Sequence, residues 1–199
     1  MTFDASHTRA YYEYRLDSDR FNSVRFNFGP IGTGTDSEIV FSLHHTDSPV
    51  AASWRPLVCE ALNSSPPCCG DFPAVTNYNP VPLISERAWL AISPLVRDTC
   101  ELLPVITPFE GSFFLLHVMR TIDAVDLARS DVARAQTRPK LIHWVNRYAF
   151  KPSVLDDVHL FKLPMTCGGG LFFDDLFRST IETNNLQGLL FIPLSMVDA

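Results

Sequence analysis

The chain has 199 residues, 46% of them hydrophobic, and can bury one substantial core. Its 16 basic and 22 acidic residues give a formal net charge of −6, which disfavours direct binding to nucleic-acid phosphates. The first residues do not have the pattern of a targeting signal, and the longest apolar runs, residues 113–119 and 188–197, are shorter than the ~20 residues that span a bilayer. We therefore expect a cytoplasmic protein of one domain, residues 1–199, with neither nucleic acid nor a membrane as partner.

The five cysteines argue against a disulfide framework and against a zinc module. Their number is odd, their spacing is irregular, and no C-x-x-C pair occurs among them. We expect reduced and mostly buried thiols, and the sequence predicts no metal and no cofactor. The cysteines are Cys59, Cys68, Cys69, Cys100 and Cys167.

In the N-terminal part, alternating side chains predict strands over residues 11–16 and 23–28. The run Glu38–Leu43 is rich in β-branched and aromatic residues, which favours a strand there. Between residues 52 and 62 the apolar side chains recur at helical intervals, which predicts a helix. Two stretches rich in turn-forming residues are expected to be surface loops, residues 29–37 and 63–82.

A helix is expected to begin after Ser85, because the serine hydroxyl can cap its first turn. Apolar residues from Ala88 to Val96 recur at three- and four-residue spacings, which places them on one side of this helix. Pro94 lacks an amide hydrogen, so we expect the helix to end near Ser93 or to restart at the proline.

The rest of the C-terminal part alternates strands with a second helix. Asp174 is expected to cap that helix, with Leu176, Phe177 and Ile181 on its apolar side, and Gly188 to lead into a terminal strand. These elements predict an α+β fold, with a mixed, largely antiparallel sheet and a few short helices packed on it. The expected strands cover residues 101–107, 112–119, 141–148 and 158–163.

Motifs of common enzyme classes are missing from the sequence. There is no G-x-S-x-G elbow, no H-E-x-x-H motif and no Walker loop. His44 and His45 would point to opposite faces of a strand, so they cannot easily bind one metal ion. His117, His143 and His159 each lie alone in an expected strand, where a histidine is usually structural.

Two glycine-rich segments are interpreted as a loop and a hairpin. Residues 29–34 lack a helix immediately after the glycines, which a dinucleotide site would need. Residues 167–170 precede the pair Asp174 and Asp175, whose charges would repel a bound anion.

Carboxylates cluster along the C-terminal part, and a solvated acidic face is the simplest interpretation. The alternative is a patch for a basic protein partner, since opposite charges accelerate encounter and select partners. On that hypothesis, reversing the charges of Asp174 and Asp175 together should slow association. The clustered residues are Asp123, Asp126, Asp131, Asp156, Asp157, Asp174, Asp175 and Glu182.

Six segments of the chain stand in a characteristic order: "DFP", "PLISERAWLAI", "CELLPV", "FFLLHVMRTIDAVDLARS", "HLFKLP" and "LFFDDLFRSTIETNNLQGLLFIPL". In order and spacing they resemble an immunity-protein family of bacterial polymorphic toxin systems. The family-like part covers about residues 71–195, whereas residues 1–63 match weakly. Two positions depart from the family pattern: Lys162 stands where arginine is expected, and Asp174 replaces a capping serine, which leaves the capping role intact.

The resemblance implies a non-enzymatic inhibitor that binds a cognate toxin or effector in the producing cell and blocks its active site, as in interbacterial competition through type VI secretion. It assigns scaffold roles to Ser85, Trp89, Ile92, Gly188 and Phe191. An acidic surface would suit a nuclease or another basic toxin. The candidate partner-binding residues are Asp123, Asp126, Asp156, Asp157, Asp174, Asp175 and Glu182.

Two other interpretations stay open at this point. One is a small enzyme with a thiol site that combines His117 or His143 with Cys100 or Cys167. The other is an adaptor of a secretion apparatus. The sequence also leaves open a homo-oligomer.

Overall fold

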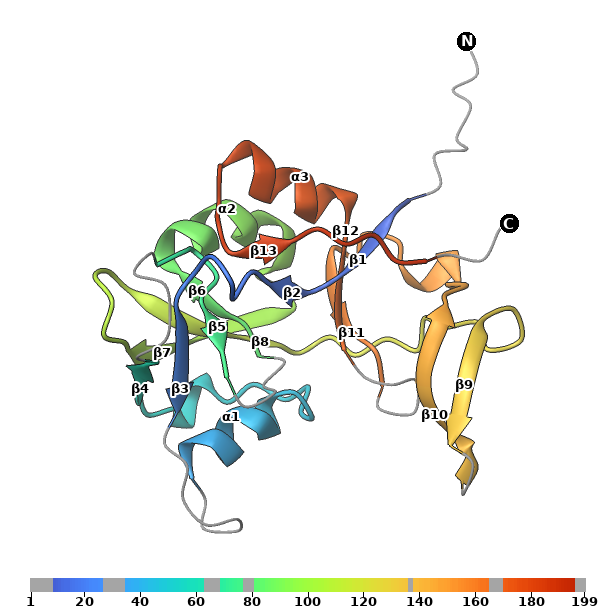
Figure 1. Cartoon of the computed structure of the whole chain (residues 1–199), viewed down its shortest axis with the longest axis horizontal. Coiled ribbons are helices and arrows are strands. Elements are labelled where there is room, and N and C mark those ends of the chain that lie inside the picture. The colour runs from blue at the N-terminus through green and yellow to red at the C-terminus, as the bar shows by residue number, and fades with distance from the viewer. Residues whose placement is uncertain are drawn as a thin grey trace.

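A computed structural model describes residues 9–26, 35–62, 69–76, 81–135, 138–164 and 170–195. Short strands in several mixed, mostly antiparallel sheets predominate, and three α-helices accompany them (Figure 1). The prediction of an α+β fold is confirmed. None of the helices in the described ranges has the length and apolar character needed to cross a bilayer.

The largest sheet has six strands in the order β5-β3-β4-β7-β8-β6. The pairs β3–β5 and β4–β7 are parallel, and the other neighbours are antiparallel. The N-terminal part of the chain therefore pairs directly with the C-terminal part through β4 and β7. The strands are β3 (Ser23–Phe26), β4 (Leu57–Ala61), β5 (Ala74–Val75), β6 (Leu83–Ser85), β7 (Cys100–Ile106) and β8 (Phe113–Val118).

Smaller sheets join the two ends of the chain. β1 (Tyr11–Glu13) and β11 (Leu160–Lys162) flank β12 (Leu171–Asp174) in an antiparallel sheet. β2 (Arg15–Leu16) pairs with β13 (Leu189–Leu190). The N-terminal residues thus complete sheets whose other strands lie in the last third of the chain.

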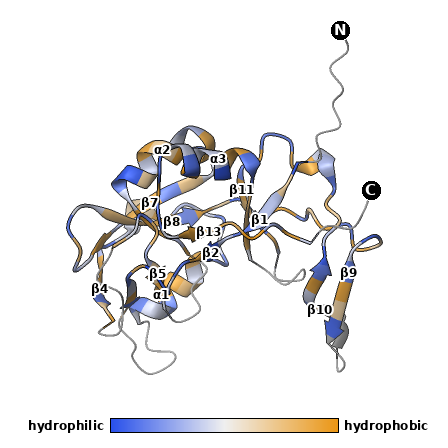
Figure 2. Ribbon diagram, turned by 45° about the horizontal axis from the view of Figure 1, so that its top comes forward, coloured by the Kyte–Doolittle hydropathy of each residue, from blue (hydrophilic) through white to orange (hydrophobic). Residues whose placement is uncertain are grey.

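A hairpin of β9 (Asp131–Ala135) and β10 (Arg138–Arg147) stands apart from the larger sheets. It lies at the opposite end of the molecule from β4 in Figure 1 and keeps a separate position in the turned view of Figure 2. Two further short helical turns are η1 (Ala51–Ser53) and η2 (Pro152–Val154).

Both expected caps are present. The Ser85 hydroxyl accepts the amide of Ala88 at 3.0 Å and begins α2 (Glu86–Val96). The Asp174 carboxylate accepts the amide of Phe177 at 2.9 Å and begins α3 (Asp175–Thr183). Each cap satisfies an amide that has no partner inside its helix.

The expectation that Pro94 ends or restarts the helix is wrong, because α2 continues through it to Val96. The proline removes only the amide that would bond to the carbonyl of Leu90, one turn earlier. Leu90 is 70% exposed, so water can reach that turn, while Ile92 and Val96 stay buried on the other side.

The strand expected over residues 38–43 is instead α1 (Asp36–Leu43). Thr35 and Glu38 form a capping box, in which each side chain accepts the other residue's backbone amide. Val40 and Leu43 are buried at helical spacing. Local capping thus overrides the β-propensity of the side chains.

The helix expected over residues 52–62 is also wrong, since this segment forms η1 and then β4. β4 pairs with β3 on one side and with β7 on the other, which supplies the backbone bonds that a helix would otherwise make. Val58, expected on the buried side of a helix, is 53% exposed, whereas Cys59 is buried.

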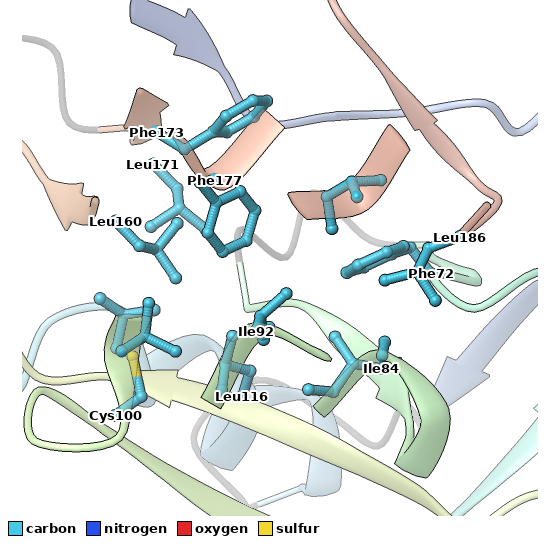
Figure 3. Packing of buried hydrophobic residues seen from close by; sticks show 14 of the residues in the cluster. Phe72, Ile84, Ile92, Cys100, Leu116, Leu160, Leu171, Phe173, Phe177 and Leu186 are labelled. Atoms are coloured by element: carbon cyan, nitrogen blue, oxygen red, sulfur yellow. The ribbon is translucent and has the colours of Figure 1, made fainter. Parts of the chain in front are cut away.

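Three hydrophobic clusters fill the interior. In the first, side chains from α3, β11 and β12 face those of α2 and β8; Figure 3 shows Phe177 and Leu160 opposite Ile92 and Leu116. The second holds aromatic residues of β1, β11 and β12, and the third lies under α1. Leu176, expected on the apolar side of α3, is 48% exposed, so that part of the prediction is wrong.

Gly188 begins the terminal strand, as expected from the sequence. Its φ angle is +113°, and a Cβ atom there would lie 2.6 Å from the carbonyl oxygen of Phe72. Both the backbone conformation and this close approach require glycine.

Candidate partner-binding surface

A groove of about 290 Å³ lies between α1, η1 and the start of β4. Its walls are mainly apolar, from Ile39 and Leu43 on α1 to Trp54 and Leu57. Ser42, Val50, Ser53 and Arg55 complete the lining. The Trp54 indole donates a hydrogen bond from Nε1 to the carbonyl oxygen of Pro104 at 2.9 Å, which fixes this wall against β7.

The loop between α1 and η1 is held by a buried lysine. Lys162 is 2% exposed, and its Nζ donates to the carbonyl oxygens of His44 at 3.1 Å and Thr46 at 2.9 Å. It also pairs with Asp47 at 3.0 Å. Burial opposes ionisation of Asp47, but hydrogen bonds from Thr121 and Lys162 outweigh it, so the pKa of this carboxyl is lowered.

The same loop is also tied to the six-stranded sheet by Glu101 and the buried His117. Glu101 accepts a bond from the amide of Val50 at 2.6 Å and another from Ala51 at 3.0 Å. His117 contacts Glu101 through Nδ1 at 2.8 Å and the carbonyl oxygen of Thr46 through Nε2 at 3.0 Å. Burial disfavours the Glu101 carboxylate, but these bonds outweigh burial, and its pKa is lowered.

The thiol-enzyme interpretation finds little support in the positions of its candidate residues. Cys100 pairs with Val118 and Glu101 with His117, so Cys100 and His117 face opposite sides of the sheet. Burial raises the pKa of the Cys100 thiol to about 12, which keeps it protonated. Cys167, together with Cys68, lies outside the described residues.

The other histidines also have structural contacts. His143 is exposed on the hairpin, and its ring lies 4.3 Å from the ring of Trp144 at an angle of 47°. Burial, and to a smaller extent the nearby charge of Lys162, lowers the pKa of His44 to about 4. This imidazole is therefore neutral at pH 7. Among the described residues, the His, Cys, Asp and Glu side chains form no group of three that could hold a metal ion.

Asp174 lies in the interior and serves the fold. It is 1% exposed, pairs with the guanidinium of Arg9 and contacts His159 Nδ1 at 2.9 Å, in addition to capping α3. Arg9 also donates to the carbonyl oxygen of Leu155 at 2.8 Å. A partner cannot reach this carboxylate on the folded protein, so reversing Asp174 would test folding rather than binding.

The other candidate acidic residues are spread over several elements. Asp175 accepts bonds from the amide of Ala10 and the hydroxyl of Tyr12, both at 2.9 Å. Asp123 pairs with Lys151 at 3.2 Å, and Asp126 accepts the amide of Ala128 in its own loop. Glu182 lies 4.0 Å from Arg178 and is about half exposed, and Asp156 and Asp157 are exposed in the turn after η2.

Another buried carboxylate, Asp71, joins three segments of the chain and was not expected from the sequence. It accepts bonds from Ser85 Oγ at 2.7 Å, from Arg87 Nε at 3.0 Å and from the amide of Gln187 at 2.9 Å. Ser85 therefore both caps α2 and links it to this carboxylate. The "DFP" segment and the first turn of the helix lie apart in the sequence, and no pattern there joins them to residue 187.

The groove was likewise not expected from the sequence as a candidate site. Its signal is the dipeptide Trp54-Arg55, since tryptophan and arginine are enriched among the residues that dominate protein interfaces. Expecting a helix there placed Trp54 among core positions instead.

Comparison with known proteins identifies a family. A family model described as "Immunity protein family (Imm11)" matches residues 73–195. A search of curated proteins finds no match.

Proposed function

Because the chain belongs to the immunity protein family (Imm11), we propose that it binds one cognate toxin in the cytoplasm and neutralises it without catalysing a reaction. The family match over more than half of the chain is the observation that carries this proposal, and it confirms the resemblance found in the sequence. The inhibitor would cover the active site of the toxin or its substrate path.

Features of the described surface support a binding role. A mainly apolar groove with an exposed arginine at its edge offers the kind of contact that dominates protein interfaces. The protonated thiol of Cys100 and its position across the sheet from His117 disfavour the alternative enzyme site. The net charge of −6 would favour a basic toxin, such as a nuclease.

Co-expression tests this function. The toxin domain encoded beside the gene of this protein should arrest growth when expressed alone and should be harmless when the protein is expressed with it. Growth is measured with the wild-type protein and with an unrelated immunity protein as the control. Continued toxicity, at protein levels sufficient to bind all of the toxin, would refute the proposal.

The acidic residues that remain exposed are proposed to speed encounter with the toxin. Asp156→Lys and Glu182→Lys should each slow association several-fold while changing dissociation little, because rim charges act mainly on the on-rate. Stopped-flow association is measured at low and high salt, and the difference should shrink as salt screens the charges. The matched control is Asp98→Lys, which makes the same change of charge at an exposed residue on another turn. If reversing the charge of a residue slows association no more than Asp98→Lys does, that residue does not contribute to encounter.

A further inference from the structure

The groove lies in a part of the chain that the family model does not match. Its lining runs from Ile39 to Leu57, whereas the match begins at residue 73. The walls are nevertheless anchored to the matched part. Lys162 and Glu101 bind backbone groups of the loop, and Trp54 donates to the carbonyl oxygen of Pro104. A surface specific to one toxin can therefore vary here without disturbing the scaffold of the family.

The size of the groove limits its occupant. A volume of about 290 Å³ is just below the ~300–1,000 Å³ of pockets that enclose small ligands. Such a space suits one large side chain and its neighbours better than a cofactor. The apolar walls formed by Ile39, Leu43, Trp54 and Leu57 select an aromatic or a long aliphatic side chain.

The charge at the edge of the groove selects a second feature of the occupant. Arg55 is exposed and, among the described residues, has no ion-pair partner. A guanidinium binds a carboxylate with two parallel hydrogen bonds, which gives direction as well as attraction. An acidic group beside the inserted side chain would satisfy Arg55, whereas a basic one would be repelled.

The walls of the groove are held in place before any partner arrives. Glu101 holds the amides of Val50 and Ala51, and the indole of Trp54 is bonded to Pro104. A surface that is already ordered loses less conformational entropy on binding. This arrangement favours a docking site over a groove that is only a gap between loops.

We propose that the groove between α1, η1 and β4 receives a projecting segment of the cognate toxin, which inserts a large apolar side chain and places an adjacent carboxylate on Arg55. This inference rests on the proposed function and names the part of the surface that carries it. At this contact, the positive charge of Arg55 meets a negative charge of the toxin. Elsewhere, the acidic surface of the protein would attract a basic toxin.

Two substitutions test the groove without touching the core. Ser42→Trp fills it from an exposed position on α1, and Arg55→Glu reverses the charge at its edge. Each should raise the dissociation constant for the toxin at least ~10-fold, as expected for a contact that dominates an interface. Calorimetric titration gives the dissociation constants, and thermal unfolding checks that each variant is folded.

The controls repeat the same chemistry elsewhere. Ser42 and Ser179 are both helical serines that donate to the carbonyl three residues earlier, so Ser179→Trp on α3 is the match for Ser42→Trp. Arg129→Glu, at an exposed arginine far along the chain, is the match for Arg55→Glu. Both controls should bind like the wild type. If the wild type binds the toxin and folded Arg55→Glu or Ser42→Trp binds as tightly, the groove is not the docking site and the proposed function still stands. If the wild type itself does not bind, both proposals fail.

Discussion

Replacing Asp174 with alanine is expected to lower the free energy of unfolding by about 3–5 kcal/mol, the usual cost of breaking a buried charge pair. The change leaves Arg9 and His159 without their shared carboxylate and removes the cap of α3. Because these contacts join the segment before β1, the turn before β11 and α3, the loss should appear as one cooperative transition. Urea unfolding followed by circular dichroism measures it.

The neighbouring residue is the control. Asp175 is partly exposed and accepts bonds from Ala10 and Tyr12, so Asp175→Ala should cost only about 1 kcal/mol. Equal losses for the two variants would contradict the assignment of Asp174 to the interior.

Replacing Lys162 with methionine is expected to destabilise the protein by about 2–4 kcal/mol. Methionine keeps most of the length of the side chain but removes the donors that hold the carbonyl oxygens of His44 and Thr46. The loop between α1 and η1 should loosen first, because Lys162 joins it to β11. Hydrogen exchange should therefore speed up in residues 44–54 more than in α3.

Lys151→Met is the matched control, because Lys151 forms an exposed pair with Asp123 and its loss should cost at most about 1 kcal/mol. An unfolding midpoint of Lys162→Met that equals that of Lys151→Met would show that the buried lysine does not stabilise the loop.

Local patterns predicted the scaffold well. Ser85 and Asp174 were identified as caps from their position before an apolar run, and Gly188 as the start of the last strand. Such features depend on residues within a few positions of each other, so they can be read directly from the sequence.

The groove was not predicted, because both of its walls were assigned to the wrong element. The capping box of Thr35 and Glu38 was overlooked, and the pairing of β4 with β3 and β7 could not be foreseen from the spacing of Trp54 and Val58. Strand pairing between distant segments overrides a local periodicity.

The charged residues show the same limit. The sequence places Asp174 and Asp175 side by side, yet the first is buried with Arg9 while the second is partly exposed. Lys162 was noted only as a departure from the family pattern, although it is fully buried and holds a loop more than a hundred residues away. Which charged side chains are buried depends on partners that lie far away in the sequence, so neighbouring residues do not reveal it.

Titration of the purified toxin with the purified protein, followed by the activity of the toxin, tests the central claim most directly. A binding inhibitor should abolish activity at an equimolar ratio, and active toxin should be recovered when the complex is dissociated. Loss of activity that continues with time at a small fraction of one equivalent, with permanently altered toxin, would show instead that the protein is a catalyst.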